Sequence, residues 1–376
     1  MKISPIKNMS INEPLKPLTK IRVLIVDDSS VMRRIIMSAL LKDPEIEVVG
    51  TSADGIEAMA DIKRIKPDLV TLDIEMPKMD GISALKEIRT FDHKLPIVMF
   101  SSLTQRGADA TIEALTCGAS DYVGKPANVS DVNEAYKILE DTLIPKIKAL
   151  CAKVALGAAT KIKSERTENA APSATRVASA ARSPRGVEAL CIGVSTGGPA
   201  ALMYLFEAWK APLTVPIFIV QHMPPQFPAL LAKRLTNIGV MPIAEPADGQ
   251  EALPGHAYIA PGGMHMAVAR SGSKVTLSLN DAPPENSCRP AVDVLFRSAA
   301  QVYGGGLLAL VLTGMGSDGL KGATAISQAG GQILAQDEES SVVWGMPGAV
   351  VGAGLANQVL PLNKFPDEIL FRLQKK

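Results

Sequence analysis

The sequence lacks any long apolar run. Its 376 residues contain no stretch of about eighteen consecutive apolar residues, the length that a membrane-spanning helix needs. The first twenty residues contain three prolines and no apolar segment of signal-peptide length. We therefore expect a disordered tail at 1–20, or a true start at Met9 rather than Met1, and a soluble protein without direct membrane insertion.

Cysteine is scarce and net charge is almost absent. The four cysteines form no C-x-x-C pair, which argues against a disulfide framework and against a zinc site and favours a reducing, cytoplasmic setting. The 39 basic and 38 acidic residues leave a formal charge of +1, so the chain has no electrostatic footprint for nucleic acid. No compact helix-turn-helix pattern and no repeat of about 20 to 50 residues is present.

A repeated alternation of short apolar runs and helical patterns is present instead. It occupies the chain from Ile21 to about Leu150 and starts again at Val187. Between these two parts, residues 157–186 contain only two large apolar residues and read as a flexible linker. The pattern predicts an α/β protein with two doubly wound, mostly parallel-sheet domains, the second interrupted by a hairpin. The expected boundaries are 21–141 for the first domain, 142–186 for a connecting helix end and the linker, and 187–376 for the second domain.

Five polar residues follow predicted strands of the first domain. Asp27 and Asp28 end the first strand, Asp73 the third, Ser101 the fourth and Lys125 the fifth. The carboxyl ends of parallel strands share one edge of a sheet, where ligands bind. Clustered carboxylates favour a divalent cation with oxygen ligands, most simply Mg²⁺, and the lysine and hydroxyl suit a phosphoryl group.

The first domain resembles the receiver domain of two-component response regulators. The resemblance lies in "VLIVDDSSVMRR", "DLVTLDIEMPKMDG" and "DYVGKP". It implies that Asp73 is the phospho-acceptor, and that Asp27 and Asp28 hold Mg²⁺ with the backbone carbonyl of Glu75. It also implies that the conformational-switch and phosphate-sensing positions are Ser101, Tyr122 and Lys125.

A glycine-rich turn opens the second domain with "CIGVSTGGPA". Residues 193–197 fit G-x-S-x-G, the pattern of a nucleophile elbow, and Pro199 suits the first turn of a following helix. A phosphate-binding loop is the competing interpretation. The dinucleotide-binding fingerprint requires a glycine at the position of Ser195 and an acidic residue at the end of the next strand. That strand ends instead in Gln221 and His222.

His222 and Asp318 complete a candidate triad with Ser195. Consecutive strands often neighbour each other in a parallel sheet, so His222 is expected beside Ser195 as its base. Asp318 follows a buried strand and the turn "VLTGMGSDG", and would orient the imidazole. His265 is the reserve base. Asp293 competes for the acidic role, but its helical pattern places it on the polar face of a helix.

The second domain resembles the catalytic domain of the chemotaxis response-regulator protein-glutamate methylesterases. The shared segments are "IGVSTGGPAAL", "VQHMPPQF", "YIAPGGMHM", "RPAVDVLFRSAA" and "VLTGMGSDG". The resemblance implies hydrolysis of glutamate methyl esters on chemoreceptors by Ser195, His222 and Asp318, and deamidation of receptor glutamines. It implies no cofactor for that step, and the backbone N–H of Met315 is our candidate for the oxyanion hole.

The order of the two domains implies regulation. In the resembling family the unphosphorylated receiver packs over the catalytic cleft, so the receiver is expected to inhibit until a chemotaxis histidine kinase supplies phosphate to Asp73. The alternative is a receiver fused to a non-catalytic nucleotide-binding sensor that uses the turn at Gly197 and Gly198 as an anion site.

Overall fold

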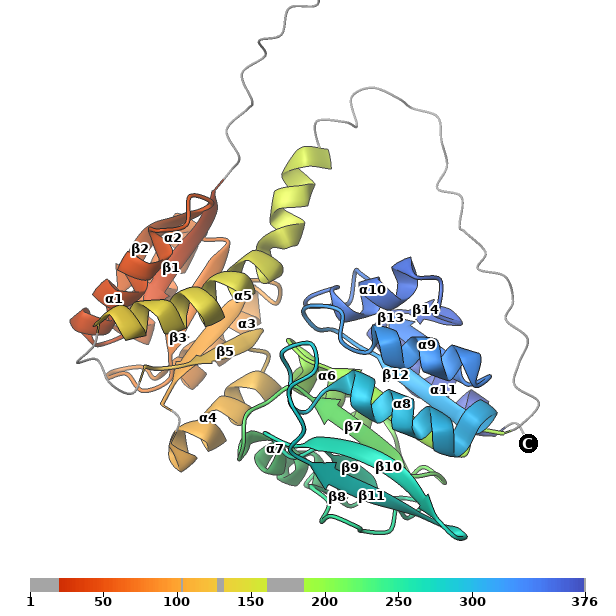
Figure 1. Cartoon of the computed structure of the whole chain (residues 1–376). Helices are drawn as coiled ribbons and strands as arrows, with labels where there is room; N and C mark the ends of the chain where they lie inside the picture. Colours follow the sequence, from red (N-terminus) through yellow and green to blue (C-terminus); the bar gives the residue numbers. More distant parts are fainter. Residues whose placement is uncertain (1–19, 103, 127–131, 161–185, 375–376) are drawn as a thin grey trace, which may run out of the picture.

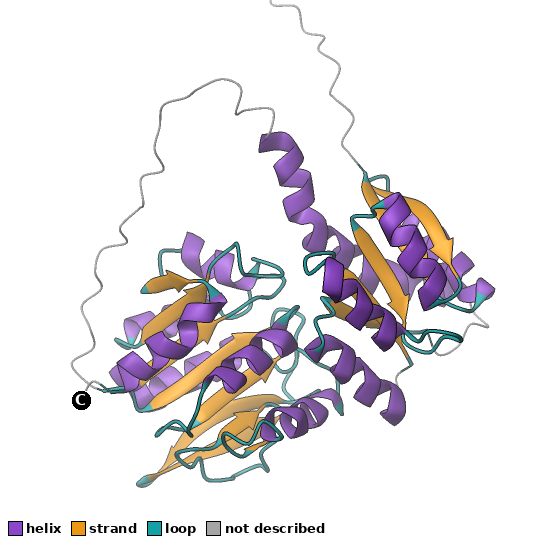
Figure 2. Cartoon of the chain, turned by 180° about the vertical axis from the view of Figure 1, so that it is seen from behind, coloured by secondary structure: helices purple, strands orange, loops and turns teal. Residues whose placement is uncertain are grey.

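The computed structural model describes residues 20–102, 104–126, 132–160 and 186–374 (Figure 1). They form two parallel β-sheets, each with helices on both faces, and one antiparallel hairpin (Figures 1 and 2). No helix in these ranges is long and apolar enough to cross a membrane. The predicted tail, apart from Lys20, and most of the predicted linker lie outside the described residues.

The first sheet has the strand order β2-β1-β3-β4-β5, and all its pairings are parallel. β3 and β4 are buried at every position, as expected of parallel strands covered on both faces. The carboxyl ends of β1, β3, β4 and β5 therefore meet at one edge. The strands are β1 (Ile21–Val26), β2 (Ile46–Ser52), β3 (Leu69–Asp73), β4 (Ile97–Ser101) and β5 (Asp121–Gly124).

Helices α1 and α5 pack on one face of this sheet, and α2, α3 and α4 pack on the other. Helices α1 to α4 are each capped by a Ser, Asp or Thr. The side chain of this residue accepts a hydrogen bond from a backbone N–H of the first turn, which would otherwise be unpaired. The helices are α1 (Ser30–Leu40), α2 (Gly55–Ile65), α3 (Gly81–Phe91), α4 (Gln105–Thr116) and α5 (Val132–Thr160).

Helix α5 is longer than the sequence predicts. It runs to Thr160, so the prediction that a flexible linker begins at Gly157 is wrong by four residues. The reason is the segment "ALGAAT", in which alanines favour helix strongly enough to extend it past the last large apolar residue.

The second sheet has seven parallel strands in the order β14-β13-β12-β6-β7-β9-β8. Helices α6, α7 and α11 cover one face and α8, α9 and α10 the other. The strands are β6 (Ala189–Val194), β7 (Ile217–Gln221), β8 (Ile243–Ala244), β9 (Ala257–Ile259), β12 (Leu307–Val311), β13 (Gln332–Gln336) and β14 (Gln358–Leu360). The helices are α6 (Gly198–Ala208), α7 (Phe227–Thr236), α8 (Val292–Tyr303), α9 (Leu320–Gln328), α10 (Met346–Gly352) and α11 (Phe365–Leu373), with the 3₁₀ turns η1 (Gly304–Gly306) and η2 (Leu362–Lys364).

The strand order of this second sheet changes direction at β6. β7 pairs with one edge of β6, and β12 pairs with the other. Ligand sites in open α/β sheets lie at the carboxyl ends of the strands beside such a switch point. The predicted hairpin is also confirmed: β10 (His265–Ser271) and β11 (Lys274–Asn280) pair antiparallel outside the main sheet.

The two parallel-sheet units pack against each other through α4, which contacts α6 and α7 (Figure 1). The ring of Tyr122 in β5 stacks on Phe227 at the start of α7, with centroids 5.0 Å apart. Arg234 of α7 donates to the hydroxyl of Thr116 at 3.0 Å and lies 3.6 Å from the carboxylate of Glu113. The contact therefore combines apolar packing with polar contacts from the same two helices.

Candidate active site and phosphorylation site

Ser195 lies in the sharp turn between β6 and α6, as the elbow pattern predicts. Gly197 has φ +79°, in the left-handed region where side chains are strained, and α6 starts at the next residue with Pro199 in its first turn. Gly193 allows close packing, because an added Cβ would lie 2.4 Å from a methyl of Val292. The glycines thus let the chain turn tightly and leave Ser195 partly exposed at the strand end.

His222 follows the neighbouring strand. Val194 of β6 pairs with Gln221 of β7, so the residues after them, Ser195 and His222, leave adjacent strand ends. Among the hydrogen bonds of the described residues, none joins the Ser195 hydroxyl to the imidazole. The structure therefore places the two residues at the same sheet edge without a direct hydrogen bond between them.

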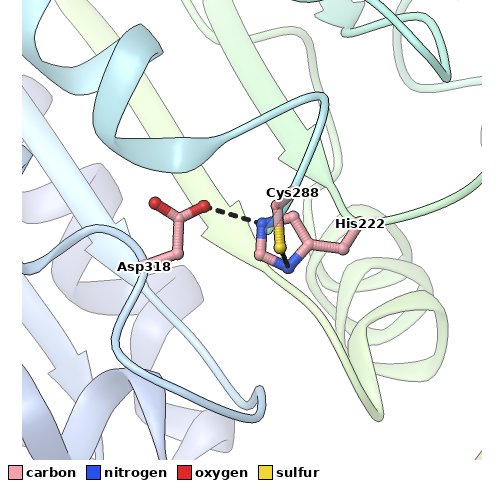
Figure 3. Close-up of side chains that lie close together, drawn as sticks. All are labelled: His222, Cys288 and Asp318. Carbon is pink, nitrogen blue, oxygen red and sulfur yellow. Dashed lines mark hydrogen bonds and ion pairs between the residues drawn. The ribbon is translucent and has the colours of Figure 1, made fainter. Parts of the chain in front are cut away.

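Asp318 lies in the turn that joins β12 to α9, on the other side of β6. Its Oδ2 lies 2.8 Å from Nε2 of His222 (Figure 3). Both side chains are largely buried, with 3% of the Asp318 side chain and 13% of the His222 side chain exposed. The three predicted residues thus come from β6, β7 and β12, which are consecutive in the sheet.

Several backbone N–H groups hold the Asp318 carboxylate. It accepts hydrogen bonds from the N–H groups of Val292 and Asp293 at the start of α8, at 2.6 and 3.0 Å, and from Gly319 at 2.9 Å. The side-chain amide of Asn286 donates a further bond at 2.8 Å. Burial acts to raise the pKa of this carboxyl, but the His222 contact and these donors outweigh it and hold the pKa below its usual range.

His222 holds its proton firmly in this arrangement. Burial by itself would lower the pKa of the imidazole. The hydrogen bonds to Asp318 and to the Cys288 thiol outweigh burial and raise that pKa to about 9. Since Nε2 contacts Asp318, the nitrogen that remains to accept a proton from a nucleophile is Nδ1.

The two reserve residues have other roles in the structure. The prediction that Asp293 lies on the polar face of a helix is wrong: it is on α8 but buried, because it accepts from the backbone N–H of Gly322 at 2.6 Å and from Asn286 at 2.8 Å. His265 is buried in β10, where its Nδ1 accepts the N–H of Ala291. Both side chains support the loop before α8.

Met315, the predicted oxyanion donor, follows Gly314 in the turn after β12. Gly314 packs directly on the nucleophile residue, since an added Cβ there would lie 2.8 Å from the Cβ of Ser195. The side chain of Met315 is 40% exposed, so the turn faces solvent at this point. The role of its N–H group stays a prediction.

Sequence reasoning missed two residues of this site. Asn286 links Asp293 to Asp318, and the Cys288 sulfur lies 3.6 Å from Nδ1 of His222 (Figure 3). Both belong to a tight turn in which Asn286 and Ser287 have positive φ. The polar run "ENSC" before α8 is a turn signal, but nothing in its spacing points toward His222.

The second site lies at the carboxyl edge of the first sheet. Asp27 and Asp73 are almost fully buried, and Asp28 is exposed beside them. One carboxylate oxygen from each of the three lies within 4.8 Å of the others. Lys125 Nζ is 2.7 Å from Asp73 and 3.1 Å from Asp27, so one cation faces the three acids.

These acids suit a hard cation. The pKa of Asp73 is raised to about 6, chiefly by burial and also by the nearby charge of Asp27, while Lys125 and the backbone N–H of Glu75 act to lower it. The Oδ2 atoms of Asp27 and Asp73 lie within ion-pair distance of Lys125 but have no hydrogen bond of good geometry. Buried carboxylate oxygens with unused acceptor capacity are the ligands that Mg²⁺ prefers.

Two of the three predicted switch residues, Ser101 and Lys125, line this pocket, and Tyr122 does not. Ser101 ends β4, and its hydroxyl donates to the backbone carbonyl of Gly107 in α4 at 3.0 Å. Glu75, whose backbone N–H donates to Asp73 at 3.3 Å, is exposed at the rim. Tyr122 is turned toward the second sheet unit, where it stacks on Phe227.

The two sites are linked by contacts at the nucleophile turn. Thr196, the residue after Ser195, donates its hydroxyl to Oδ2 of Asp121 in β5 at 2.5 Å, and both residues are buried. The adjacent N–H of Gly197 donates to the carbonyl of Ser120 at 3.2 Å. The first sheet unit therefore contacts the turn that carries the candidate nucleophile.

Together the two sites define a class of protein: a receiver joined to an α/β domain with a serine-hydrolase constellation. Comparison with known families agrees, since residues 23–137 match the response regulator receiver domain and residues 190–369 match the CheB methylesterase. The chain belongs to the CheB methylesterase family. The resemblance and the two-sheet α/β fold predicted from the sequence are confirmed.

Similar proteins cover almost the whole chain. The protein-glutamate methylesterase/protein-glutamine glutaminase of Trichodesmium erythraeum is 49% identical over 360 residues, which is 95% of this chain and 100% of the relative. The protein of the same name from a Nocardioides species is 49% identical over 358 residues, covering 95% and 96%. The crystal structure of the Thermotoga maritima CheB methylesterase catalytic domain is 40% identical and covers 50% of this chain and 99% of that one, with a TM-score of 0.48. The names of the two relatives and the two family matches support the esterase interpretation and not the nucleotide-binding alternative.

Proposed function

We propose that this protein is a phosphorylation-activated serine esterase that hydrolyses glutamate methyl esters on chemoreceptors and deamidates receptor glutamines. The observation that carries the proposal is the placement of Ser195, His222 and Asp318 at the ends of three consecutive strands, with Asp318 bonded to His222 at 2.8 Å. The names of the relatives support protein-bound glutamate methyl esters and glutamines as the groups acted on. A cytoplasmic location and a chemotaxis histidine kinase as phosphodonor belong to the same proposal.

The chemistry is acyl transfer in two steps. Ser195 Oγ attacks the ester carbonyl carbon while Nδ1 of His222 takes its proton, and Asp318 orients the ring and stabilises the imidazolium. The carbon–oxygen bond of the ester then breaks, and methanol leaves with that proton. Water hydrolyses the acyl-enzyme by the same route and restores the serine. A glutamine side chain follows the same course with ammonia as the leaving group.

The oxyanion of the tetrahedral intermediate needs donors near Ser195. The N–H of Met315 is the candidate, because Gly314 packs against the nucleophile residue and the turn after it is exposed. One such donor typically lowers the barrier by about 3 kcal/mol.

Phosphoryl transfer takes place at the other site. Asp73 is the phospho-acceptor in this proposal. Asp27, Asp28, Asp73 and the backbone carbonyl of Glu75 would hold Mg²⁺, which would supply positive charge to offset that of the phosphoryl group. Lys125 already lies within 3.1 Å of two of these carboxylates and would pair with the phosphoryl oxygens. This step is separate from ester hydrolysis, which needs no metal in our proposal.

The receiver inhibits the esterase until Asp73 is phosphorylated. Three observations support this proposal: α4 packs on α6 and α7, Tyr122 stacks on Phe227, and Thr196 is bonded to Asp121 beside the nucleophile. Phosphorylation draws Ser101 inward, Tyr122 follows, and the stacked contact weakens.

Released methanol tests the function directly. We expect the full chain to release radiolabelled methanol from methylated receptor membranes, and a small phosphodonor with Mg²⁺ to increase the rate. Ser195→Ala should abolish release while Asp73 is still phosphorylated, because nucleophile and phospho-acceptor belong to separate sites. Near-normal release by that variant would overturn the triad assignment.

A truncated protein tests the inhibition. Residues 187–376 without the receiver should be more active than the unphosphorylated full chain and should not respond to phosphodonor. Equal rates for the two proteins, with no phosphodonor response of the full chain, would refute inhibition and leave the esterase assignment standing.

A further inference from the structure

Cys288 forms a second constellation around the catalytic imidazole. Its Sγ lies 3.6 Å from Nδ1 of His222 and over the face of the ring, whereas Asp318 contacts the ring edge at Nε2 (Figure 3). One ligand atom from each of these three residues lies within 4.8 Å of the others. Of the two such groups in the described ranges, the other is the carboxylate pocket of the receiver, so only this one contains sulfur.

The spacing of sulfur and nitrogen fits a tetrahedral metal ion. Zn–N bonds of about 2.0–2.1 Å and Zn–S bonds of about 2.3 Å, at the tetrahedral angle, place the two ligand atoms roughly 3.5 Å apart. The distance between Cys288 Sγ and His222 Nδ1 is 3.6 Å. Because Cys288 lies over the face of the ring in Figure 3, its side chain has to rotate toward the ring plane before Sγ and the Nδ1 lone pair can share a zinc ion.

The surroundings orient the imidazole and hold the turn that carries the thiol. Asp318 contacts Nε2 of His222, the carboxylate–histidine arrangement that orients imidazole ligands of zinc. Cys288 closes a tight turn through two backbone hydrogen bonds with Glu285, at 2.9 and 3.1 Å. The side chain of Glu285 is in turn held by both terminal nitrogens of Arg297.

The site is also reachable and selective. Cys288 and His222 are both partly exposed, so an ion can enter without unfolding the domain. Thiolate and imidazole are soft and borderline ligands that favour Zn²⁺ over Mg²⁺, whereas the receiver pocket offers only carboxylate and carbonyl oxygens. The two metal sites of the chain would thus take different ions.

We propose that Zn²⁺ binds between Cys288 Sγ and His222 Nδ1, with Asp318 as the outer partner of the imidazole, and reversibly inhibits the esterase. Binding displaces the thiol proton and the Nδ1 proton of the imidazolium into solvent, and solvent fills the remaining positions. The inhibition rests on the proposed function, because the ion occupies the nitrogen that takes the proton of Ser195. The binding itself does not depend on that function.

Cobalt absorbance tests binding without any esterase assay. Co²⁺ replaces Zn²⁺ in tetrahedral sites, and a cobalt–thiolate bond adds a near-ultraviolet charge-transfer band that oxygen ligands do not produce. Titrating the full chain, reduced and freed of metal, should produce this band with a stoichiometry of one, and added Zn²⁺ should remove it. Absence of the band would overturn the proposal.

Cysteine variants locate the site. Cys288→Ala should remove the band and weaken Zn²⁺ binding, measured by competition with a zinc-sensitive dye, by at least about tenfold. Cys117→Ala is the matched control, since Cys117 is also a partly exposed free thiol but belongs to α4's end in the receiver. An unchanged band in Cys288→Ala, or its loss in Cys117→Ala, would place the metal elsewhere and refute the site.

Methanol release tests the consequence. Each variant is compared with its own rate in chelator, so that any direct effect of the substitution cancels. Zn²⁺ should inhibit the wild type and Cys117→Ala, chelator should restore the rate, and Cys288→Ala should need at least about ten times more Zn²⁺ for the same inhibition. A normal cobalt band with no inhibition by Zn²⁺ would refute the inhibitory role. Absence of methanol release in chelator would count against the esterase function instead and leave the binding result intact.

Discussion

Thr196→Val removes one hydrogen bond from the contact between receiver and nucleophile turn. Valine keeps the shape of threonine but cannot donate to Asp121, whose carboxylate now accepts the threonine hydroxyl at 2.5 Å. A hydrogen bond to a charged group contributes about 1.5–3 kcal/mol. Asp121 keeps its bond to Lys146 at 2.7 Å, so the substitution leaves no unpaired charge and the lower value applies. At about 1.4 kcal/mol per factor of ten, the balance between closed and open receiver should shift roughly tenfold toward open.

The assay is basal methanol release without phosphodonor, in the full chain and in residues 187–376. Because Thr196 follows the nucleophile, the informative quantity is the ratio of the two rates, in which any direct effect on catalysis cancels. We expect Thr196→Val to bring the ratio up to about ten times closer to one. Thr324→Val, the same change on the exposed side of α9, should leave it unaltered. A ratio that Thr196→Val does not change would refute the claim that this bond contributes to inhibition.

Three further predictions concern single sites. For the pH dependence, kcat/KM should rise with pH toward the His222 pKa of about 9, because the imidazole can accept a proton only when neutral, and Asp318→Asn should lower both that midpoint and the maximal rate; a rate independent of pH between 6 and 9 would contradict this. For stability, Gly193→Ala should lower the free energy of unfolding in urea by about 1–3 kcal/mol because its Cβ meets α8 at 2.4 Å, whereas Gly352→Ala, with nothing within 4 Å, should not. For the receiver, Asp73→Asn should abolish phosphorylation from a small phosphodonor, as should removal of Mg²⁺ from the wild type, and label that persists in the variant would place the phospho-acceptor elsewhere.

Much of the fold and of both sites follows from local patterns. Continuous apolar runs such as "LVTLD" and "LLALV" predict buried parallel strands, and the structure buries every residue of both. Because functional side chains of such sheets cluster at the carboxyl ends of strands, residues such as Ser195, His222 and Asp73 could be placed before any distance was known. Residues far apart in the sequence are therefore predicted to lie at the same edge of a sheet when each follows a strand of that sheet.

Helix α4 shows that local sequence patterns do not predict contacts between the two domains. Its sequence "QRGADATIEALT" has only two large apolar residues, so it lacks the stripe that predicts an amphipathic helix. It packs on β4, β5 and α3 of its own unit and also on α6 and α7, which lie about a hundred residues further along the chain. The same holds for the bond between Thr196 and Asp121, since contacts between domains leave no periodicity in either partner.

The sequence does not predict the turn before α8 for a different reason. Asp293 looks like a solvent-facing helical residue because its neighbours on the helix are spaced as a polar face, yet the loop of Asn286 and Cys288 folds over it. That loop depends on positive φ at Asn286 and Ser287, which the residue types allow but do not require. The contact of Cys288 with His222 follows only once that backbone conformation is known.

The stacking of Tyr122 on Phe227 implies that each domain can influence the other. A residue that joins the two domains and is also proposed to belong to the receiver's switch would couple two equilibria, and equilibrium coupling is reciprocal. If phosphorylation loosens the contact, then whatever displaces the receiver from the catalytic domain must stabilise the phosphorylated receiver, relative to the unphosphorylated one, by the same factor. A substrate that displaces the receiver from the turn of Ser195 would therefore shift the receiver's equilibrium toward the phosphorylated state, so that substrate itself would favour the active enzyme.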